Sequence, residues 1–362
     1  MQYRRLGKTE LKVSLISFGA IKLPQVDYAE AEACLNRALD LGVNFVDTAR
    51  GYHDSEEKIG RALKTRRSEY YLATKSSARD AQGAMDDLET SLCNLGSDYV
   101  DLWQLHSVSD TNTYDQVLAV GGAYEAAVRA KQQGKARHLG VSIHRCHVTM
   151  NRAIPSGLFE TLMVAYSPLD QEGLRAEILP LAQRFDLGVI VMKGLSGGAL
   201  TLPRGEGDPP PSGGDPLVRG ALRYIVSTPG VSTVIPGIMH VHEAEENCAT
   251  ADLPLPMSEQ DRDALLRRIG SLRRGFRYGQ VCLRCGYCQP CPEGVQIPTI
   301  FRAADMHRSY PEHLRHMGAE LFRSIEVGPE HCTECGRCEQ LCPAGLPIRE
   351  KLKEAAHLFA AG

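Results

Sequence analysis

Eight short β-rich runs alternate with amphipathic stretches over most of this chain. The runs are residues 13–20, 43–49, 70–76, 100–107, 138–144, 162–170, 188–195 and 232–238. The stretches between them, such as 28–42 and 84–96, carry apolar residues at helical spacing and end in glycine, as helices commonly do. Eight strand–helix units in about 250 residues predict a (β/α)8 TIM barrel. A doubly wound sheet is the alternative, but no GxGxxG turn follows the first run.

Beyond residue 281 the chain changes character and carries two compact cysteine runs. The first reads C-x2-C-x2-C-x2-C-P and the second C-x2-C-x2-C-x3-C-P, which is the spacing of bacterial ferredoxins. The cysteines are Cys282, Cys285, Cys288 and Cys291, then Cys332, Cys335, Cys338 and Cys342. Such runs hold two [4Fe-4S] clusters, and each fourth cysteine crosses to the other cluster. We therefore expect Cys342 to join the first three cysteines and Cys291 to join the second three; two all-thiolate zinc sites are the competing interpretation.

The change in composition sets the expected domain limits. We predict the barrel over residues 1–274 and a small ferredoxin-like domain over 275–362. The Pro- and Gly-rich insertion at 201–216 is expected to be a mobile loop on the catalytic face. The four remaining cysteines are expected to be small core residues: Cys34, Cys93, Cys146 and Cys248.

Composition and charge exclude several classes of protein. The net charge is −3 and no long run of like charge occurs, which argues against a nucleic-acid partner. No apolar stretch reaches membrane-spanning length, and the N-terminus lacks the apolar core of a signal peptide. Together with the clustered cysteines, these features predict a cytoplasmic protein that binds neither nucleic acid nor membrane.

Four polar residues stand at or just beyond the ends of three successive runs: Asp47, Tyr52, Lys75 and His106. In a barrel those ends converge at one face, where barrel enzymes keep their chemistry. A free tyrosine, with a pKa near ~10, is a poor acid at neutral pH, but an adjacent ammonium favours the phenolate. We expect Tyr52 to donate a proton to a substrate oxygen, with Lys75 tuning it. Asp47 would hold Lys75 in place, and His106 would orient the oxygen.

The segments DTARGYHDSEEKIG, ATKS, DLWQLH and STVIPGIMHVHEAEEN resemble motifs of the aldo-keto reductase family, over roughly residues 1–270. The cysteine tail is similar to the two-cluster tails on one branch of such proteins. The resemblance implies that the Asp, Tyr, Lys and His form the catalytic tetrad. It also implies that a bound nicotinamide delivers hydride to a small carbonyl or alcohol substrate.

The same resemblance indicates the cofactor contacts, with some departures. The positions concerned are Ser142, Met192, Lys193, Gly194, Leu195, Gly237, Glu243, Glu246 and Asn247. Where relatives hold the carboxamide with Asn and Gln, this chain has Ile143 and Ala165. Gly237 and Glu243 stand at or near the places where NADP-preferring relatives often carry Lys and Arg. Because a carboxylate repels a 2′-phosphate and can accept from a free 2′-hydroxyl, Glu243 favours NAD(H).

Three functions follow from these observations. In the first, an oxidoreductase passes electrons between the barrel and its clusters. Nicotinamide gives up two electrons as hydride whereas each cluster takes one, and the sequence has no flavin fingerprint. A flavin, or a partner such as ferredoxin or a flavoprotein, would have to intervene, unless the substrate accepts single electrons. The alternatives are an NAD(P)H-dependent carbonyl reductase with structural or redox-sensing clusters, and a non-enzymatic redox sensor.

Overall fold

The computed structural model describes residues 1–144, 146–169, 173–198, 200–201, 215–272, 282, 286–309, 315–342 and 345–360. The chain divides into two compact units: Met1–Gly194 with Val218–Ser258, and Leu195–Leu217 with Glu259–Gly362. The predicted boundary between residues 274 and 275, and most of the insertion at 201–216, lie outside the described residues. The domain limits 1–274 and 275–362 therefore stay a prediction.

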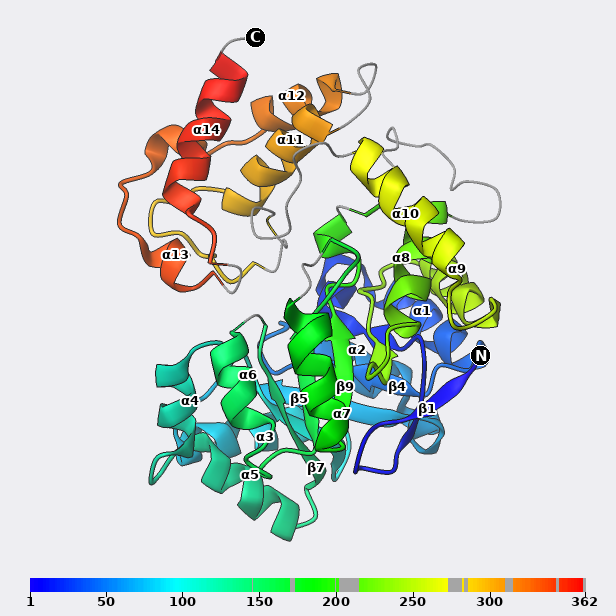
Figure 1. The fold of residues 1–362 in the computed structure, drawn as a ribbon. Coiled ribbons are helices and arrows are strands. Elements are labelled where there is room, and N and C mark those ends of the chain that lie inside the picture. The colour runs from blue at the N-terminus through cyan, green and yellow to red at the C-terminus, as the bar shows by residue number, and fades with distance from the viewer. Residues whose placement is uncertain are drawn as a thin grey trace. The chain divides into compact units, whose positions relative to one another are not determined.

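The first unit is built on an eight-stranded parallel sheet whose strands follow one another in chain order (Figure 1). The strands are β3 (Phe18–Gly19), β4 (Phe45–Asp47), β5 (Tyr71–Ser76), β6 (Val100–Leu105), β7 (Ala136–Ser142), β8 (Thr161–Ala165), β9 (Gly188–Met192) and β10 (Thr233–Val234). Parallel bridges from Ile16 to Val234 and from Gly19 to Gly237 join the first strand to the last. The sheet is thus closed, and the predicted (β/α)8 barrel is confirmed.

Helices connect the strands and surround them (Figure 1). They are α1 (Tyr28–Asp40), α2 (Ser55–Ala62), α3 (Ala81–Leu95), α4 (Thr111–Leu118), α5 (Ala123–Gln132), α6 (His147–Ala153), α7 (Leu179–Arg184), α8 (Pro216–Val226) and α9 (Val241–Ala249). Three of them begin after an aspartate whose carboxylate accepts a hydrogen bond from the third helical residue: Asp27, Asp80 and Asp110. This bond satisfies a backbone N–H that the helix itself cannot, and it fixes where each helix starts.

The predicted first strand is divided in the structure. Its beginning belongs to β2 (Lys12–Ser14), which pairs antiparallel with β1 (Tyr3–Arg5). Only Phe18–Gly19 enters the barrel as β3. A continuous apolar run does not show where a chain leaves one sheet and joins another, so the prediction over 13–20 was wrong in extent.

The scattered cysteines do not all lie in the core. Cys34 and Cys248 are buried, as expected, and Cys146 is half-buried. Cys93, on α3, is exposed, so its assignment to the core was wrong. It lies on the outward side of an amphipathic helix whose buried residues are Ala84, Leu88, Ser91, Leu92 and Leu95.

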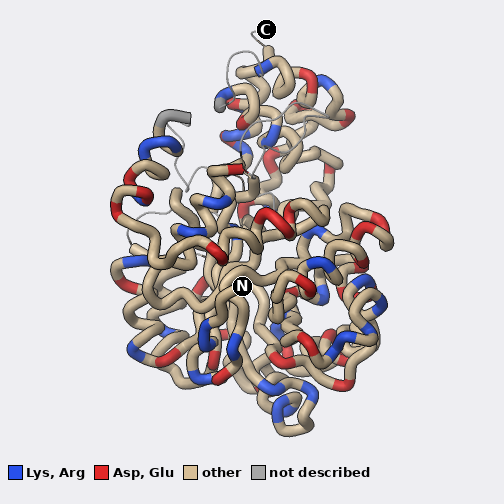
Figure 2. Tube along the Cα trace, turned by 90° about the vertical axis from the view of Figure 1, so that its right-hand side faces the viewer, with Lys and Arg blue, Asp and Glu red and all other residues tan. Residues whose placement is uncertain are grey.

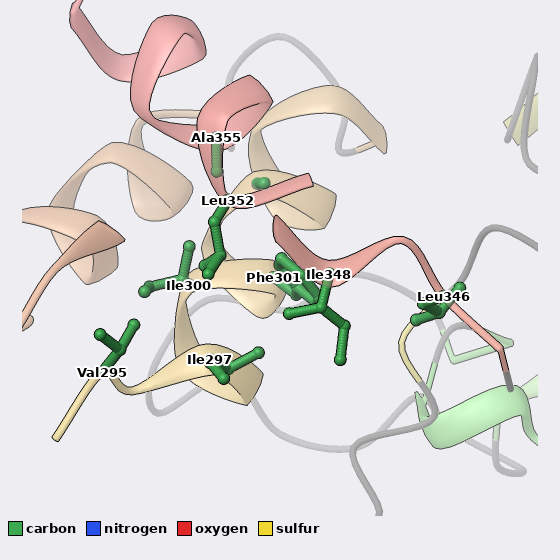
Figure 3. Packing of buried hydrophobic residues seen from close by; sticks show 9 residues of the cluster. Val295, Ile297, Ile300, Phe301, Leu346, Ile348, Leu352 and Ala355 are labelled. Carbon is green, nitrogen blue, oxygen red and sulfur yellow. The ribbon is translucent and has the colours of Figure 1, made fainter. Parts of the chain in front are cut away.

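The second unit contains α10 (Glu259–Leu272), α11 (Ile297–Ser309), α12 (His316–Arg323), α13 (Arg337–Gln340) and α14 (Ile348–Ala360). Its apolar core is shown in Figure 3 and consists of Val295, Ile297, Ile300, Phe301, Ala304, Leu346, Ile348, Leu352 and Ala355. Most of these side chains come from α11 and α14 at three- and four-residue intervals, so each helix turns one apolar face inward.

Positive and negative charges are mixed along the described chain, with Lys and Arg interspersed among Asp and Glu (Figure 2). Within the described residues, no helix is both long enough and apolar enough to span a bilayer.

Candidate active site and cluster-binding region

The carboxyl ends of the barrel strands, here called the mouth, hold a buried ion pair. Asp47 is the last residue of β4, and Lys75 lies near the end of the neighbouring β5. Lys75 Nζ donates to Asp47 Oδ1 at 2.5 Å and to the carbonyl oxygen of Thr48 at 2.6 Å. Gln104 Nε2 donates to the second carboxylate oxygen of Asp47 at 3.1 Å. The carboxylate and the ammonium are both almost completely buried, so the charge of each is compensated mainly by the charge of the other.

Tyr52 and His106 lie beside this pair. The ammonium of Lys75 is 5.1 Å from the centre of the Tyr52 ring. The rings of Tyr52 and His106 meet edge to face, with centroids 5.8 Å apart. His106 directly follows β6, and Tyr52 lies in the loop between β4 and α2. The four polar residues that the sequence singles out are therefore brought together at the mouth.

Burial dominates the electrostatics of this cluster. It lowers the pKa of Lys75, against the attraction of Asp47. It raises the pKa of Asp47, while Lys75 and Gln104 work in the opposite direction. Burial, followed by the positive charges of Lys75, Arg79 and Lys193, holds the pKa of His106 well below its ordinary value. His106 is thus a neutral imidazole at physiological pH, able to take part in hydrogen bonds without carrying a charge.

This arrangement can carry out proton chemistry on an oxygen atom. An ammonium held beside a phenol stabilises the phenolate and so favours release of the phenolic proton. A neutral imidazole beside the same phenol can hydrogen-bond the oxygen that receives the proton. The geometry therefore suits proton transfer to a carbonyl oxygen, or from an alcohol.

Gln104 is a member of the cluster that sequence reasoning missed. Its side chain is fully buried and contacts Asp47. A signal was present, because an amide in the apolar run VDLWQLH is unusual. It also stands two residues before His106, so the alternation of a strand puts the two side chains on one face.

Among the predicted cofactor contacts, Ser142 and Lys193 lie at strand ends near the mouth. Ser142 closes β7, and its Oγ accepts a hydrogen bond from the backbone N–H of Ser107 at 2.9 Å. Lys193 follows β9 in a left-handed conformation (φ 59°), and its Nζ lies 3.4 Å from His144 Nδ1. Met192, the last residue of β9, is half-buried.

The two glycines of the predicted cofactor set are explained by packing. A Cβ on Gly194 would lie 2.7 Å from Ile225 Cδ1, and one on Gly237 would lie 3.0 Å from Lys22 Cγ. A larger residue at either position would displace a neighbouring side chain. Leu195, predicted with them, begins the segment that belongs to the second compact unit.

The start of α9 is capped by one of the predicted cofactor contacts. Glu243 Oε2 accepts hydrogen bonds from the backbone N–H groups of Met239 at 2.7 Å and His240 at 3.2 Å. This is the returning half of a capping box, which the sequence H-x-x-E only faintly indicates because His is not a usual first residue. Asn247 is buried and Glu246 half-buried farther along the same helix.

The cysteine runs meet around one core. Cys285 lies outside the described residues. Six of the others pack against the apolar core of the second unit: Cys282, Cys288, Cys291, Cys332, Cys338 and Cys342. A hollow is lined by Cys288 and Cys291 of the first run and by Cys332, Cys335 and Cys338 of the second. Cysteines from both runs thus line one space, as a cluster with a crossing ligand requires.

The two runs also share a backbone conformation. Gly286 and Gly336 occupy the same place in C-G-x-C and adopt left-handed φ values of 79° and 75°. Gly294 and Gly345, three residues after the final cysteine of each run, are left-handed as well. Glycine suits these positions because other residues are strained there. Among the described residues, no three His, Cys, Asp or Glu side chains are grouped so as to hold a single metal ion.

Comparison with known proteins agrees with this fold and these motifs. Residues 15–216 match the model of the aldo/keto reductase family, and residues 279–346 match that of the 4Fe-4S dicluster domain. The chain is 26% identical over 290 residues to the uncharacterized oxidoreductase YqkF of Bacillus subtilis, covering 70% of this chain and 92% of that protein. It is 29% identical over 287 residues to L-galactose dehydrogenase of Arabidopsis thaliana, covering 69% and 88%.

A solved structure gives the same result. The holo form of aldo-keto reductase AKR11C1 from Bacillus halodurans superposes with a TM-score of 0.63 at 27% identity, covering 74% of this chain and 96% of that one. The fold and the mouth define a barrel oxidoreductase. The chain belongs to the aldo/keto reductase family, and it carries a C-terminal 4Fe-4S dicluster domain.

Proposed function

We propose that this oxidoreductase interconverts a small carbonyl compound and its alcohol at the mouth of the barrel, with Tyr52 as the proton donor and acceptor. The observation that carries the proposal is the buried Lys75–Asp47 pair, whose ammonium lies 5.1 Å from the Tyr52 ring. A site that only binds a ligand has no need of a buried ammonium beside a phenol, since burying that charge is costly.

Each residue of the cluster has a distinct task in this mechanism. Asp47 anchors Lys75, and the ammonium of Lys75 favours loss of the phenolic proton of Tyr52. In reduction Tyr52 gives that proton to the substrate oxygen, and in oxidation it takes the proton back. His106, held neutral, hydrogen-bonds the same oxygen. A nicotinamide, when bound, supplies or accepts the hydride.

The residues at the mouth fit a nicotinamide cofactor, with fewer polar contacts to its carboxamide than usual. The Ser142 oxygen accepts from Ser107 N–H, and its own proton remains available for donation. Ile143 and Ala165 are buried and apolar, so they offer the carboxamide no hydrogen bond. Lys193 supplies a cation suited to a phosphate. Met192, Gly194 and Gly237 complete the proposed wall of the site, with Glu246 and Asn247 on the adenine side. Leu195 is proposed as a cofactor contact from its motif alone.

Glu243 supports a preference for NAD(H). Its carboxylate occupies the backbone N–H groups of Met239 and His240 at the start of α9. A helix N-terminus otherwise attracts phosphate, and here it already has an anion. A 2′-phosphate would meet a negative charge at this place, whereas a free 2′-hydroxyl could donate to it.

In the C-terminal domain we propose two [4Fe-4S] clusters. Cys282, Cys285, Cys288 and Cys342 would hold one, and Cys291, Cys332, Cys335 and Cys338 the other. The second set is supported by the hollow that its four cysteines line together, at a place where Cys288 of the first set also contributes to the lining. Two clusters exchange two electrons in total, which equals the change between an alcohol and a carbonyl. A flavin, a flavoprotein or a ferredoxin is the partner expected to connect one-electron and two-electron steps.

A second function is favoured by one observation. The cysteines pack against the apolar core of their unit, so the clusters could serve mainly to hold that unit folded. The chain would then be a nicotinamide-dependent carbonyl reductase whose clusters are structural or redox-sensing.

The proposed function is tested by replacing Tyr52. With a simple aromatic aldehyde such as 4-nitrobenzaldehyde and either NADH or NADPH, we expect Tyr52→Phe to lower kcat on the order of 100-fold or more. The binding of the nicotinamide, measured by fluorescence, should change little. Tyr71→Phe on β5 is the matched control and should keep its activity. Turnover by Tyr52→Phe equal to that of the wild type would exclude Tyr52 as the acid.

A further inference from the structure

The residue that follows His106 has an unusual backbone. Ser107 adopts a left-handed conformation with φ 57°. Such a conformation is uncommon for a residue other than glycine, and it persists where the surroundings impose it. The His106–Ser107 segment is therefore held in place by its neighbours, and it carries an imidazole of the proposed active site.

Two of the hydrogen bonds that fix this segment come from Arg79. Its Nη1 donates to the carbonyl oxygen of His106 at 2.8 Å, and its Nη2 donates to that of Ser107 at 3.2 Å. On the other side, the backbone N–H of Ser107 donates to Ser142 Oγ. One guanidinium thus spans two successive carbonyl groups, which its rigid fork of donors allows and a single ammonium does not match.

Arg79 is itself anchored. Its carbonyl oxygen accepts from the backbone N–H of Ala123, the first residue of α5, at 2.9 Å. The next residue, Asp80, forms an antiparallel bridge with Gly122. The side chain is half-buried, and burial lowers the pKa of its guanidinium. The charge of Arg79 is consequently fixed relative to β6 and close to the imidazole.

We propose that Arg79 is a positioning residue for His106, which fixes the His106–Ser107 backbone and places a positive charge beside the imidazole at the mouth. The proposal rests on the proposed function for the meaning of His106, but its test does not depend on turnover. A purely mechanical tie between β6 and the loop after β5 would account for the hydrogen bonds alone, and the charge of Arg79 would then have no effect on the ring.

The charged and titratable groups that face His106 come from several elements. Lys75 from β5, Arg79 from the following loop and Lys193 from the turn after β9 are cations that disfavour its protonation. Tyr52 meets the ring edge to face, and Ser77 Oγ lies 3.3 Å from His106 Nδ1. Removing the charge of Arg79 takes away one of three cations, so protonation of His106 becomes easier.

The test follows the imidazole directly by NMR of protein labelled with ¹⁵N-histidine and assigned with His106→Gln. In the wild type we expect the His106 ring to take up a proton only well below pH 6.5. In Arg79→Gln and Arg79→Met the midpoint of its titration should shift upward. Arg79→Lys keeps the positive charge but not the paired donors of the guanidinium. In this variant the His106 ring should titrate as in the wild type, and its signal should be broadened. Arg152→Gln, which removes a surface arginine paired with Asp115, is the control and should change nothing.

The outcomes separate this proposal from its alternatives. Neutral variants that fold and keep the wild-type titration would overturn it. If neither neutral variant folds, Arg79→Lys decides, and a ring signal identical to that of the wild type would again overturn the proposal. Because the experiment measures the titration of the His106 ring, its result remains valid even if Tyr52→Phe shows that the reaction takes place elsewhere.

Discussion

Lys75 is the residue whose replacement has the clearest physical consequence. In Lys75→Met, the carboxylate of Asp47 stays buried with Gln104 as its remaining side-chain partner. An uncompensated buried charge costs about 3–5 kcal/mol, so we expect a loss of that order in the free energy of unfolding. The single tryptophan, Trp103, is buried in β6, and its fluorescence during urea denaturation reports the unfolding of the barrel.

The matched control is Lys131→Met, which removes an exposed lysine from a pair with the half-buried Glu160. Glu160 keeps its hydrogen bonds with His138 and with the backbone N–H of Leu139, so this variant should lose no more than about 1 kcal/mol. The double variant Asp47→Asn/Lys75→Met should recover part of the loss, because it leaves no buried charge. Equal stability of Lys75→Met and Lys131→Met would contradict the buried pair.

His106 predicts a dependence of stability on pH. Its pKa in the folded protein lies well below the ordinary value of 6.5, chiefly because of burial. Below pH 6.5 the unfolded chain therefore binds a proton that the folded protein does not. Above that pH the contribution of His106 to the free energy of unfolding is fully present. As the pH drops below it, the free energy of unfolding decreases by up to about 1.4 kcal/mol per pH unit. Urea midpoints at pH 7.5, 6.5 and 5.5 should show a smaller acid loss in His106→Gln, and no such change in His242→Gln, an exposed residue on α9.

At the scale of elements, the residue that caps α9, Glu243, is also the one proposed to determine the preference between NADH and NADPH. Glu243→Gln keeps an oxygen that can accept from Met239 and His240 but removes the negative charge. We expect the ratio of the NADPH and NADH dissociation constants to move toward NADPH by roughly fivefold to tenfold, which corresponds to about 1 kcal/mol of charge interaction. Glu245→Gln, which changes an exposed carboxylate of the same helix that pairs with Arg37, is the control. An unchanged ratio in Glu243→Gln would remove the basis for the NAD(H) preference.

The elements also show how far sequence reasoning reaches. The barrel could be predicted because eight strand–helix alternations leave few folds open, and the motifs at the strand ends placed Asp47, Lys75 and His106 at one mouth. The division of residues 13–20 between two sheets could not be predicted, because a segment buried on both sides has the same apolar pattern whether it forms one strand or two. The roles of Gln104 and Arg79 depend on hydrogen bonds between segments distant in the chain, which no local pattern encodes. The cap made by Glu243 is local, but His in the first position hides it.

For the whole molecule, the open question is whether the clusters serve the chemistry of the barrel. Cys288 and Cys291 of the first run both line the hollow in the second unit, and Cys291 is the one proposed to cross to the cluster of the second run. With anaerobic preparation, we expect wild-type protein to hold about eight iron atoms per chain, and Cys291→Ser to hold closer to four, because one cluster loses a ligand. Cys93→Ser, which changes an exposed cysteine of α3, is the control and should keep the full iron content.

The same variant distinguishes the two candidate functions. If electrons pass through both clusters, Cys291→Ser should lose turnover with a one-electron donor such as reduced methyl viologen while keeping aldehyde reduction by NADH. If the clusters are structural, turnover with NADH should fall only as far as the second unit loses its fold, which circular dichroism measures. Retention of the full iron content in Cys291→Ser would show that this cysteine is not a ligand, and the crossing arrangement would be wrong. The tightened spacing before Cys291 makes this the most informative of the cysteines to change, since one residue fewer must still bring its sulfur to the cluster of the other run.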